Sequence, residues 1–364
     1  MTMTRRQMMT TTVAAAAVSA TAAAAHEGTA SDVALQAVFD RVGSPALAGM
    51  LVGPEGAIWT GARGVRREGG PAATTDDLWH LGSNTKAMTA ALYGRLVDKG
   101  QASWTATLGE ALPDTPMDTA WTDVPIKQVM AHRAGLSDAT ALGQSWLMTA
   151  RSDPASLTEQ RRTLAEAMLA SPPAGTPGTF AYGNGNYILL GAIIERITGG
   201  SWEDAMRSEV FAPLGITTGG FGAPQGDQPW GHAAGRAIDP TGPVTDNPLA
   251  LGPAATAHMT LQDYGRFLRI FLAEGAGWVS PETLAVLMTP VGEGAPPYAG
   301  GWIVPPSQPW AGGPCLAHDG SNTMWYASTW VAPAIGKAFV AVSNDAQRGG
   351  PACQALIPAL IQSI

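Results

Sequence analysis

Residues 78–89 read Leu-Trp-His-Leu-Gly-Ser-Asn-Thr-Lys-Ala-Met-Thr and place a serine and a lysine at the start of a predicted helix. That helix is expected over Asn84 to Val97. Ser83 and Lys86 therefore lie about one turn apart on the same helix face. The helix N-terminus adds free backbone N–H groups and the positive end of the helix dipole.

The Ser83-x-x-Lys86 spacing suits nucleophilic catalysis. A serine hydroxyl is a weak nucleophile until a base removes its proton. A neighbouring amine can do so when burial lowers its pKa from ~10.4. The chain has 18 Ser and 4 Lys, so chance predicts about 0.2 such pairs. A serine that caps the helix, with a solvated lysine one turn later, explains these four residues equally well. The spacing alone therefore does not distinguish a catalytic pair from a helix cap.

Strand-like segments occur at both ends of the chain. The runs 46–52 and 58–62 flank a turn at 53–56, and the runs 326–331 and 338–343 flank a turn at 333–336. Neither pair makes a useful sheet alone. The predicted fold class is therefore α/β (α+β), with one antiparallel sheet that is built from both chain ends and flanked by helices. A mostly helical domain is inserted between the ends.

Capping sequences and helical periodicity dominate the middle of the chain. Ser156-x-x-Glu159, Ser201-x-x-Asp204 and Thr260-x-x-Asp263 precede helical segments that run toward Ala170, Phe211 and Glu274. Other helices are expected over 31–42, 187–198 and 352–361, the last with a kink or break at Pro358. Residues 215–257 are rich in Gly and Pro and predict ordered loops. The predicted sheet domain comprises 26–98 and 255–364, and the predicted helical insertion comprises 99–254.

The composition excludes several classes of protein. Of 364 residues, 45% are hydrophobic and 14% charged, which is too apolar for a disordered tail and allows an ample core. The net charge is −8 and no run of Lys or Arg exceeds two, so nucleic acid is not an expected partner. Two cysteines exclude a disulfide framework or a Cys-rich zinc fold. Whether Cys315 and Cys353 pair stays open.

The N-terminal residues 1–25 read as an export signal. Arg5 and Arg6 are followed by an Ala-rich stretch, and Ala23-Ala24-Ala25 is a small-residue cleavage site. The run Thr4–Met9 resembles a twin-arginine signal, with an ordinary secretory signal as the alternative. The stretch is marginal for spanning ~30 Å of hydrocarbon. We expect a periplasmic or secreted protein that keeps no stable membrane anchor after cleavage.

Tyr182-Gly183-Asn184 is the only Tyr-x-Asn in the chain and follows a turn-rich segment at 171–178. A phenol beside a cationic lysine ionises more easily and can serve as a general base. The amide of Asn184 can hold a substrate and the lysine. A Gly-rich loop with an ordinary interface tyrosine is a strong alternative for this motif in isolation.

His318-Asp319-Gly320 stands just before Ser321 and a probable strand. Glycine lets a ligand approach the backbone closely. A strand edge here can bind an extended substrate, with the Ser321 N–H facing an oxyanion. The alternative is a strand-edge histidine followed by an Asp-Gly turn. Asp319 should point away from the site if the strand alternates.

The remaining histidines receive structural assignments. His80 is read as structural, and His132 is assigned with Arg133 to a helix end. His232 and His258 lie in loop or helix-start settings without the spacing of metal ligands, and the chain has no His-Glu-x-x-His. The sequence therefore implies no metal and no cofactor.

The order of the three motifs carries a family resemblance. Ser-x-x-Lys follows the N-terminal hairpin, Tyr-x-Asn lies in the helical insertion, and His-x-Gly opens the C-terminal strands. From about residue 30 to the C-terminus the chain resembles the serine β-lactamase-like family. The branch it resembles contains class C β-lactamases, serine DD-peptidases, D-aminopeptidases and carboxylesterases. The flanking segments 78–89, 126–138 and 182–199 agree.

The resemblance implies a role for each motif residue. Ser83 would be the acylated nucleophile, Lys86 would share its proton, and Tyr182 would be the general base. Asn184 would orient the substrate and Lys86. His318 would polarise the site or meet a substrate carboxylate. Gly320 would let the substrate approach closely, and the N–H groups of Ser83 and Ser321 would form the oxyanion hole.

The chain departs from the family pattern at two positions. His318 stands where many relatives have lysine, which fits the DD-peptidase and aminopeptidase side better than a dedicated class C β-lactamase. Gly183 stands where serine is common. No candidate exists for the deacylating glutamate of class A enzymes.

The leading hypothesis is an exported serine hydrolase that forms an acyl-enzyme on an amide or ester. A small molecule or a short peptide or ester would be the substrate. The alternatives are a class C-like β-lactamase and a non-catalytic β-lactam- or peptidoglycan-binding protein. The three motifs are intact, which argues against the last. The oligomeric state is left open.

Overall fold

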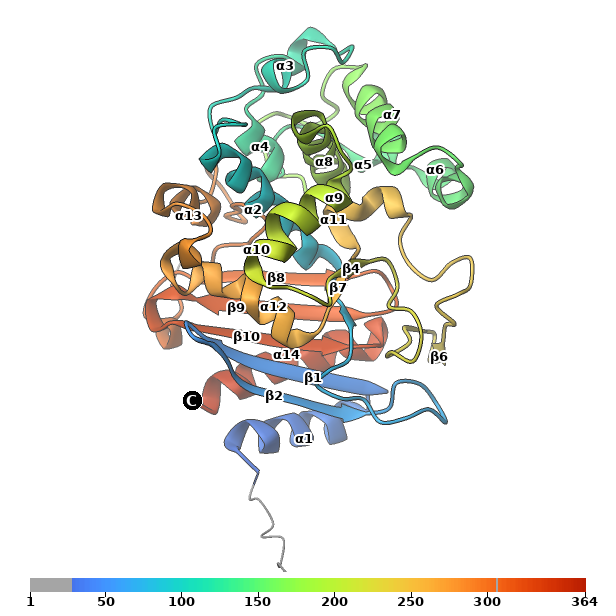
Figure 1. Ribbon diagram of the computed structural model, residues 1–364, viewed down its shortest axis with the longest axis vertical. Helices are drawn as coiled ribbons and strands as arrows, with labels where there is room; N and C mark the ends of the chain where they lie inside the picture. The colour runs from blue at the N-terminus through green and yellow to red at the C-terminus, as the bar shows by residue number, and fades with distance from the viewer. Residues whose placement is uncertain (1–27, 306) are drawn as a thin grey trace, which may run out of the picture.

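A five-stranded antiparallel sheet forms the base of the protein (Figure 1). The computed structural model describes residues 28–305 and 307–364. The sheet order is β2-β1-β10-β9-β8. The strands are β1 (Ala46–Gly53), β2 (Gly56–Gly64), β8 (Leu316–Ser321), β9 (Tyr326–Ala332) and β10 (Lys337–Ser343). The N-terminal hairpin thus pairs with the C-terminal strands, as predicted, and the predicted fold class is confirmed.

The N-terminal and C-terminal strands meet at the β1–β10 pair. Leu47 pairs with Ser343 and Val52 with Ala338, and every residue of β1 is buried. Near-continuous burial of this kind requires cover on both sheet faces. Residues of β1 and β10 accordingly contribute to two hydrophobic clusters, one on each side of the sheet.

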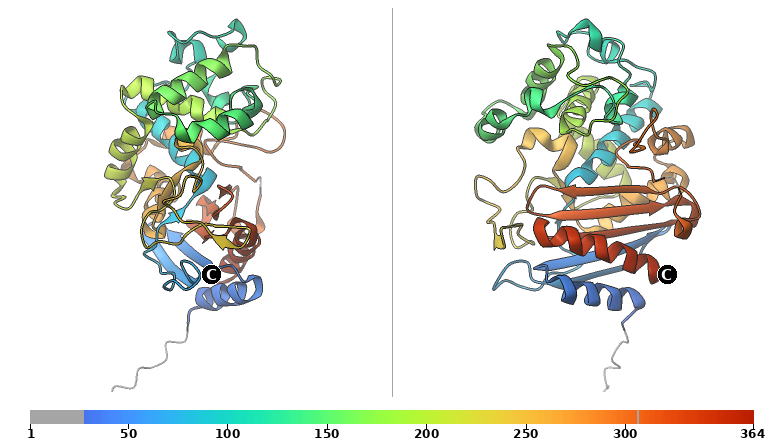
Figure 2. Two further views of the ribbon diagram at one scale, coloured as in Figure 1. Left: turned by 90° about the vertical axis from the view of Figure 1, so that its right-hand side faces the viewer. Right: turned by 180° about the vertical axis from the view of Figure 1, so that it is seen from behind.

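Helices α1 (Ala30–Val42) and α14 (Ala346–Gln362) cover one face of the sheet, as Figure 2 shows. Leu356 and Leu360 of α14 pack there with Leu35 of α1. The predicted start of the last helix, Ala352, is wrong. The Asp345 side chain accepts hydrogen bonds from the N–H groups of Gln347 and Arg348 and starts the helix at Ala346. Pro358 lies inside the helix without ending it, because packing outweighs the lost hydrogen bond.

Helices cover the opposite face of the sheet and extend beyond it (Figure 1). They are α2 (Thr85–Asp98), α3 (Leu108–Ala111), α4 (Ile126–Met130), α5 (Asp138–Ala141), α6 (Gln144–Thr149), α7 (Leu157–Leu169), α8 (Asn184–Thr198), α9 (Trp202–Met206), α10 (Ala212–Leu214), α11 (Gly252–Ala255), α12 (Leu261–Leu268) and α13 (Pro281–Met288). Ser156, Ser201 and Thr260 cap α7, α9 and α12 as predicted. Helix α12 ends at Leu268, before the predicted helix end at Glu274. Just after Glu274, the left-handed backbone of Gly275 and Ala276 redirects the chain.

A smaller three-stranded sheet has the order β3-β7-β4. It consists of β3 (Trp79–His80), β4 (Gly220–Phe221) and β7 (Ala257–Met259), and a separate pair joins β5 (His232–Ala233) and β6 (Arg236–Ala237). Residues 215–257, predicted as ordered loops, thus contain three of these strands. Because β3 ends three residues before Ser83, its pairing with β7 fixes where the helix α2 begins.

A buried ion cluster fixes the helix that carries Asn184. Arg161 of α7 is fully buried, and its Nη2 lies 2.6 Å from Glu195 Oε1 of α8 and 2.7 Å from Glu203 Oε2 of α9. Its Nε and Nη1 bind the same two carboxylates at 2.9 and 3.0 Å. All three helices are therefore tied to one guanidinium.

We expect Arg161→Met to destabilise the fold strongly. The substitution leaves two carboxylates buried without their cation, which costs about 3–5 kcal/mol of unfolding free energy. Thermal and urea unfolding measure the loss. The adjacent Arg162 is the matched control, because its ion pairs with Glu159 and Glu166 are exposed, so Arg162→Met should leave the midpoint nearly unchanged. Equal midpoints for the two variants would contradict the assignment.

Two of the sequence predictions remain predictions. The export signal at 1–25 lies outside the described residues. The domain boundaries near 98 and 255 are not tested by the packing. In the described part of the chain, Cys315 and Cys353 are both buried and free, in different hydrophobic clusters. Burial raises the pKa of the Cys315 thiol to about 11. Within residues 28–305 and 307–364, none of the helices has the length and apolarity to cross a bilayer.

Candidate active site

Ser83 and Lys86 face one another at the start of α2, as their spacing predicted. Ser83 belongs to a single 3₁₀ turn, Gly82–Asn84, that leads into the helix. Lys86 Nζ donates to Ser83 Oγ at 3.0 Å. The lysine side chain is fully buried, which excludes the alternative of a solvated lysine one turn after a capping serine.

Two further acceptors hold the Lys86 amine in place. Nζ donates to Asn184 Oδ1 at 2.9 Å and to the Ala254 carbonyl at 3.0 Å. Asn184 comes from the second motif, as predicted, whereas the Ala254 carbonyl belongs to α11 and had no sequence signal. With three acceptors around three protons, the amine has one defined orientation toward Ser83.

The start of α8 fixes Asn184. The Asp138 carboxylate accepts from the N–H groups of Asn184 and Gly185, both at 2.8 Å. A Cβ on Gly183 would lie 2.6 Å from Asp138 Oδ1. Glycine therefore stands at 183 because the capping carboxylate occupies the space that a side chain would need. Sequence reasoning missed Asp138, which lies 46 residues before Asn184.

Tyr182 lies over Lys86 and is partly open to solvent. The ring centroid is 4.9 Å from Lys86 Nζ, and 48% of the residue is exposed. Its ring packs against His132, with centroids 4.5 Å apart. Among the described residues no hydrogen bond partner for the Tyr182 hydroxyl is present. Catalytic hydrogen bonds often tighten only with substrate bound, so the general-base role stays a prediction.

His132 is part of the wall behind Tyr182. It is buried, adopts a left-handed conformation with φ of 57°, and packs against Tyr182 and Tyr298. Its Nδ1 accepts from the Gly183 N–H at 3.4 Å. Burial, followed by the Lys86 charge, holds the pKa of His132 well below its usual value. The predicted helix-end assignment is confirmed, because the His132 and Arg133 N–H groups donate to the Val129 and Gln128 carbonyls of α4 at 3.1 and 2.8 Å. The Arg133 side chain also binds the carbonyls of Gly178 and Gly294.

His318 lies within β8 rather than ahead of a strand, because the Asp319-Gly320 pair continues the ladder with β9. Its Nδ1 donates to the Asp319 carbonyl at 2.6 Å, so Nε2 accepts from the Tyr298 hydroxyl at 2.9 Å. Burial and then the Lys86 charge lower the pKa of His318 to about 3. The third motif therefore presents a neutral imidazole, with both nitrogens engaged.

The backbone of Gly320 and Ser321 lies against the Ser83 turn. A Cβ on Gly320 would be 2.1 Å from the Leu81 carbonyl and 2.8 Å from the Ser83 nitrogen. A Cβ on Gly82, whose φ is 52°, would be 2.4 Å from the Ser321 nitrogen. Only glycine at both positions permits this approach. It places the backbone at Ser83 beside the backbone at Ser321. That their N–H groups form an oxyanion hole stays a prediction.

A cavity of about 510 Å³ opens beside the nucleophile. Its lining comprises Ser83, Tyr182, Ile303, Pro305, Ala317, His318, Asp319 and Trp330. Asp319 is the only charged residue among them, and its Oδ2 accepts from the Tyr326 hydroxyl at 2.8 Å. Lys86 is not among the lining residues, and its amine donates to Ser83 Oγ. The lining therefore suits an apolar or neutral group next to the scissile bond.

The buried neutral histidine predicts acid-dependent stability. Unfolding restores the ordinary pKa of 6.5 to His318, so between about 3 and 6.5 the unfolded chain binds more protons. Its contribution to stability is thus fully present above pH 6.5 and is lost as the pH falls toward 3. The slope is up to about 1.4 kcal/mol per pH unit. Unfolding free energies from pH 7 to 4.5 should fall less for His318→Gln than for the parent, and parallel slopes would contradict this.

Comparison with known proteins places this site in a family. The family model described as Beta-lactamase matches residues 34–360. Penicillin-binding protein 4 of Amycolatopsis lactamdurans is 29% identical over 317 residues, which cover 82% of this chain and 80% of that protein. An unguisins hydrolase of Aspergillus campestris is 25% identical over 331 residues, which cover 85% of this chain and 60% of that protein.

Solved structures show the same fold at low identity. The octameric penicillin-binding protein homologue of Pyrococcus abyssi gives a TM-score of 0.74 at 20% identity and covers 91% of this chain and 76% of its own. The class C beta lactamase of Rhodobacter sphaeroides gives a TM-score of 0.71 at 19% identity, and the match covers 92% of this chain and 100% of that one. The matched segment includes all three motifs, and the chain belongs to the beta-lactamase family of serine hydrolases.

Proposed function

We propose that the protein is an exported hydrolase that forms an acyl-enzyme on Ser83 and cleaves an ester or amide. The observation that carries the proposal is the Lys86 amine, which donates to Ser83 Oγ at 3.0 Å and is held by Asn184 and the Ala254 carbonyl. The amine sits where it can share the hydroxyl proton as the serine attacks. The residue 1–25 sequence supports export.

The reaction divides into two steps at one site. In acylation, Ser83 Oγ attacks the substrate carbonyl and its proton passes to Tyr182, which acts as the phenolate. The Lys86 ammonium stabilises the charge that develops on Oγ, and the leaving amine or alcohol takes the proton from Tyr182. The N–H groups of Ser83 and Ser321 stabilise the oxyanion, and each such donor is worth about 3 kcal/mol. In deacylation, Tyr182 activates a water, which releases the acid and restores the Ser83 hydroxyl.

The cavity favours substrates that carry no free carboxylate beside the scissile bond. His318 is neutral, with Nε2 accepting a hydrogen bond, and Asp319, the one carboxylic acid among the described lining residues, has its carboxylate bound to the Tyr326 hydroxyl. A substrate carboxylate would meet no cation there. This supports an esterase or a D-aminopeptidase-like amidase over a DD-carboxypeptidase or a class C-like β-lactamase.

Reaction with β-lactams is the second candidate. It is supported by the relationship to the penicillin-binding protein 4 of Amycolatopsis lactamdurans, over 82% of this chain. In that case a penicillin would acylate Ser83 and deacylate slowly, as in a peptidase, or quickly, as in a β-lactamase.

A substrate panel with the mature chain distinguishes these candidates. The panel contains a short-acyl p-nitrophenyl ester, D-alanine p-nitroanilide, a D-Ala-D-Ala peptide and a chromogenic cephalosporin. We expect turnover of the ester or the anilide and little of the other two. Rapid cephalosporin turnover would instead establish the β-lactamase, and cleavage of the D-Ala-D-Ala peptide would establish the carboxypeptidase.

A further inference from the structure

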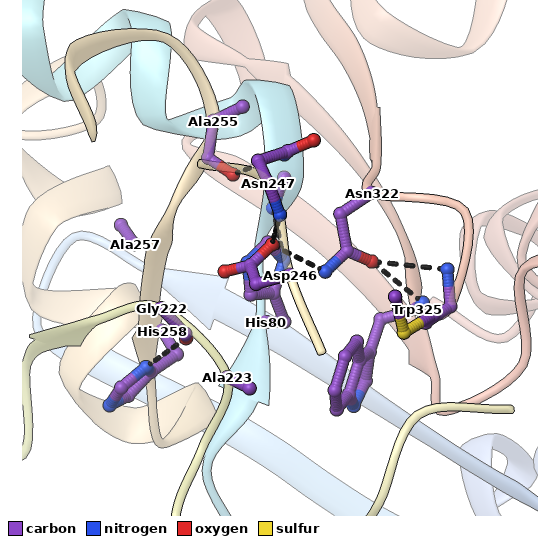
Figure 3. A network of polar contacts seen from close by, with 12 residues as sticks. His80, Gly222, Ala223, Asp246, Asn247, Ala255, Ala257, His258, Asn322 and Trp325 are labelled. Carbon is purple, nitrogen blue, oxygen red and sulfur yellow. Dashed lines mark hydrogen bonds and ion pairs between the residues drawn. The ribbon is translucent and has the colours of Figure 1, made fainter. Parts of the chain in front are cut away.

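The carboxylate of Asp246 contacts His80 and Asn322, which come from two segments far apart in the sequence (Figure 3). The side chain is buried. Its Oδ2 lies 2.8 Å from His80 Nε2, and its Oδ1 accepts from Asn322 Nδ2 at 2.7 Å. His80 stands three residues before Ser83, and Asn322 directly follows Ser321. The Asp246 carboxylate thus contacts one residue that precedes Ser83 and one that follows Ser321. The N–H groups of Ser83 and Ser321 are the two donors assigned to the oxyanion hole.

The first branch runs from Asp246 through His80 to the turn of the nucleophile. The Gly82 N–H donates to His80 Nδ1 at 3.1 Å, so this nitrogen is an acceptor and the ring proton sits on Nε2. The Nε2–H then donates to Asp246. Since Asp246 fixes the ring and the ring fixes the Gly82 N–H, the Leu81–Gly82 peptide has one orientation. It directly precedes the Gly82–Ser83 peptide, which carries the Ser83 N–H.

The second branch runs from Asp246 through Asn322 to the end of β8. Asn322 Oδ1 accepts from the N–H groups of Met324 and Trp325 at 3.2 and 3.0 Å, which leaves Nδ2 to donate to Asp246. The Trp325 ring stacks on His80 with centroids 5.5 Å apart and 26° between planes. The two branches therefore also touch each other directly.

Asp246 is itself held from the helical part of the fold. Arg151 donates to the Asp246 carbonyl through Nε at 3.2 Å and Nη2 at 2.7 Å. The Asn247 N–H donates to Asp246 Oδ1 at 2.6 Å. The carboxylate has a fixed position, so it can act as a brace for the segments it binds.

We propose that Asp246 is a positioning residue that sets the distance between the Ser83 and Ser321 N–H groups through His80 and Asn322. The proposal rests on the acyl-transfer function proposed above. The Gly82 and Gly320 backbones approach one another closely with no side chain between them, so their relative position depends on the residues that hold each segment. A shift of about 1 Å at such a site can cost a hundredfold in rate.

Asp246→Asn tests the brace with little change of volume. The amide keeps one acceptor oxygen in place of two, so its N–H₂ must face a donor. If the oxygen keeps the bonds from Asn322 and Asn247, the N–H₂ faces His80 Nε2–H, and if it keeps the bond from His80, the N–H₂ faces Asn322 Nδ2 and the Asn247 N–H. We expect kcat to fall about ten- to hundredfold with KM within twofold, because the oxyanion is bound in the transition state rather than in the ground state. Fluorophosphonate labelling of Ser83 should slow in parallel.

Asp263→Asn is the matched control. Asp263 is also buried and accepts from the N–H groups of Thr217 and Thr218, at 2.8 and 2.7 Å, but it lies in α12 away from Ser83. The Asp263→Asn variant should be less stable than the parent, and its kcat should equal that of the parent. Equal kcat losses in the two variants, at equal losses of Tm, would reduce Asp246 to a structural residue and overturn the proposal.

Two substitutions at His80 separate the contacts of its ring. In His80→Gln, the side-chain N–H₂ lies near the position of Nε2 and keeps the bond to Asp246. In His80→Asn, the side-chain oxygen lies near the position of Nδ1 and keeps the bond from the Gly82 N–H. Each should lower kcat, and combining His80→Gln with Asp246→Asn should cost less than the product of the single losses, since both act through Gly82. Fully multiplicative losses would overturn the linkage.

A spectroscopic readout distinguishes failure of the brace from failure of the proposed function. In ¹⁵N–¹H spectra, Asp246→Asn should shift the amide signals of both Gly82 and Ser321, and Asp263→Asn should shift neither. If the parent protein labels at Ser83 while Asp246→Asn moves neither signal, the brace is wrong and the function stands. If the parent neither labels nor turns over while both signals move, the function is wrong and the brace stands.

Discussion

Ser83→Ala is expected to abolish covalent labelling and to reduce hydrolysis by about a thousandfold or more, since nothing else at the site can form the acyl bond. Intact mass after brief exposure to a fluorophosphonate, and separately to a penicillin, measures the adduct. The parent chain should gain one adduct per molecule. The substitution removes a hydroxyl that accepts from Lys86, so its effect is on chemistry while the fold is retained.

Ser44→Ala is the appropriate control for that measurement. Ser44 is buried and its Oγ lies 2.5 Å from Ser343 Oγ, in the sheet region and away from the cavity. It should lose some stability and still label fully. An adduct that persists in Ser83→Ala would contradict the assignment of the nucleophile. A parent protein that shows turnover without an adduct would indicate rapid deacylation rather than an idle site.

The sequence was informative where chemistry is encoded locally. Ser83, Lys86 and Asn184 come from two short motifs 98 residues apart, and the structure brings them within hydrogen-bond distance. Motif order and the resemblance supplied this juxtaposition in advance. The sheet built from both chain ends followed from two strand pairs that cannot form separate sheets.

The sequence was uninformative where contacts join distant, aperiodic segments. Asp246 lies in the Gly- and Pro-rich stretch 215–257, and its partners His80 and Asn322 are 166 and 76 residues away. Asp138 caps α8 from 46 residues upstream. No local pattern marks such carboxylates, because their partners are set by tertiary structure alone.

The predicted ends of β8 and α14 were wrong for a related reason. The Asp319-Gly320 pair is typical of a turn, yet it continues β8 because pairing with β9 supplies its hydrogen bonds. Pro351 and Pro358 are typical of helix ends, yet α14 passes through both because its apolar face packs on the sheet. In each case tertiary packing outweighed a local preference.

Tyr182→Phe is expected to slow acylation and deacylation by about a hundredfold to ten-thousandfold, the usual contribution of a general base. The ring and its contact with Lys86 and His132 remain, so the change isolates the hydroxyl. Single-turnover acylation and kcat on the preferred substrate measure the effect. Loss of the basic group should also flatten the pH dependence of kcat/KM on its acid side.

Tyr187→Phe gives the sharpest comparison, because Tyr187 also lies beside Lys86, with Nζ 5.6 Å from its ring centroid. Its hydroxyl donates to the Met130 carbonyl, and burial raises its pKa well above the ordinary value, so it cannot act as a base. Losing that hydroxyl should lower stability and leave kcat unchanged, the reverse of Tyr182→Phe. Near-normal turnover by Tyr182→Phe would eliminate the phenol as the base.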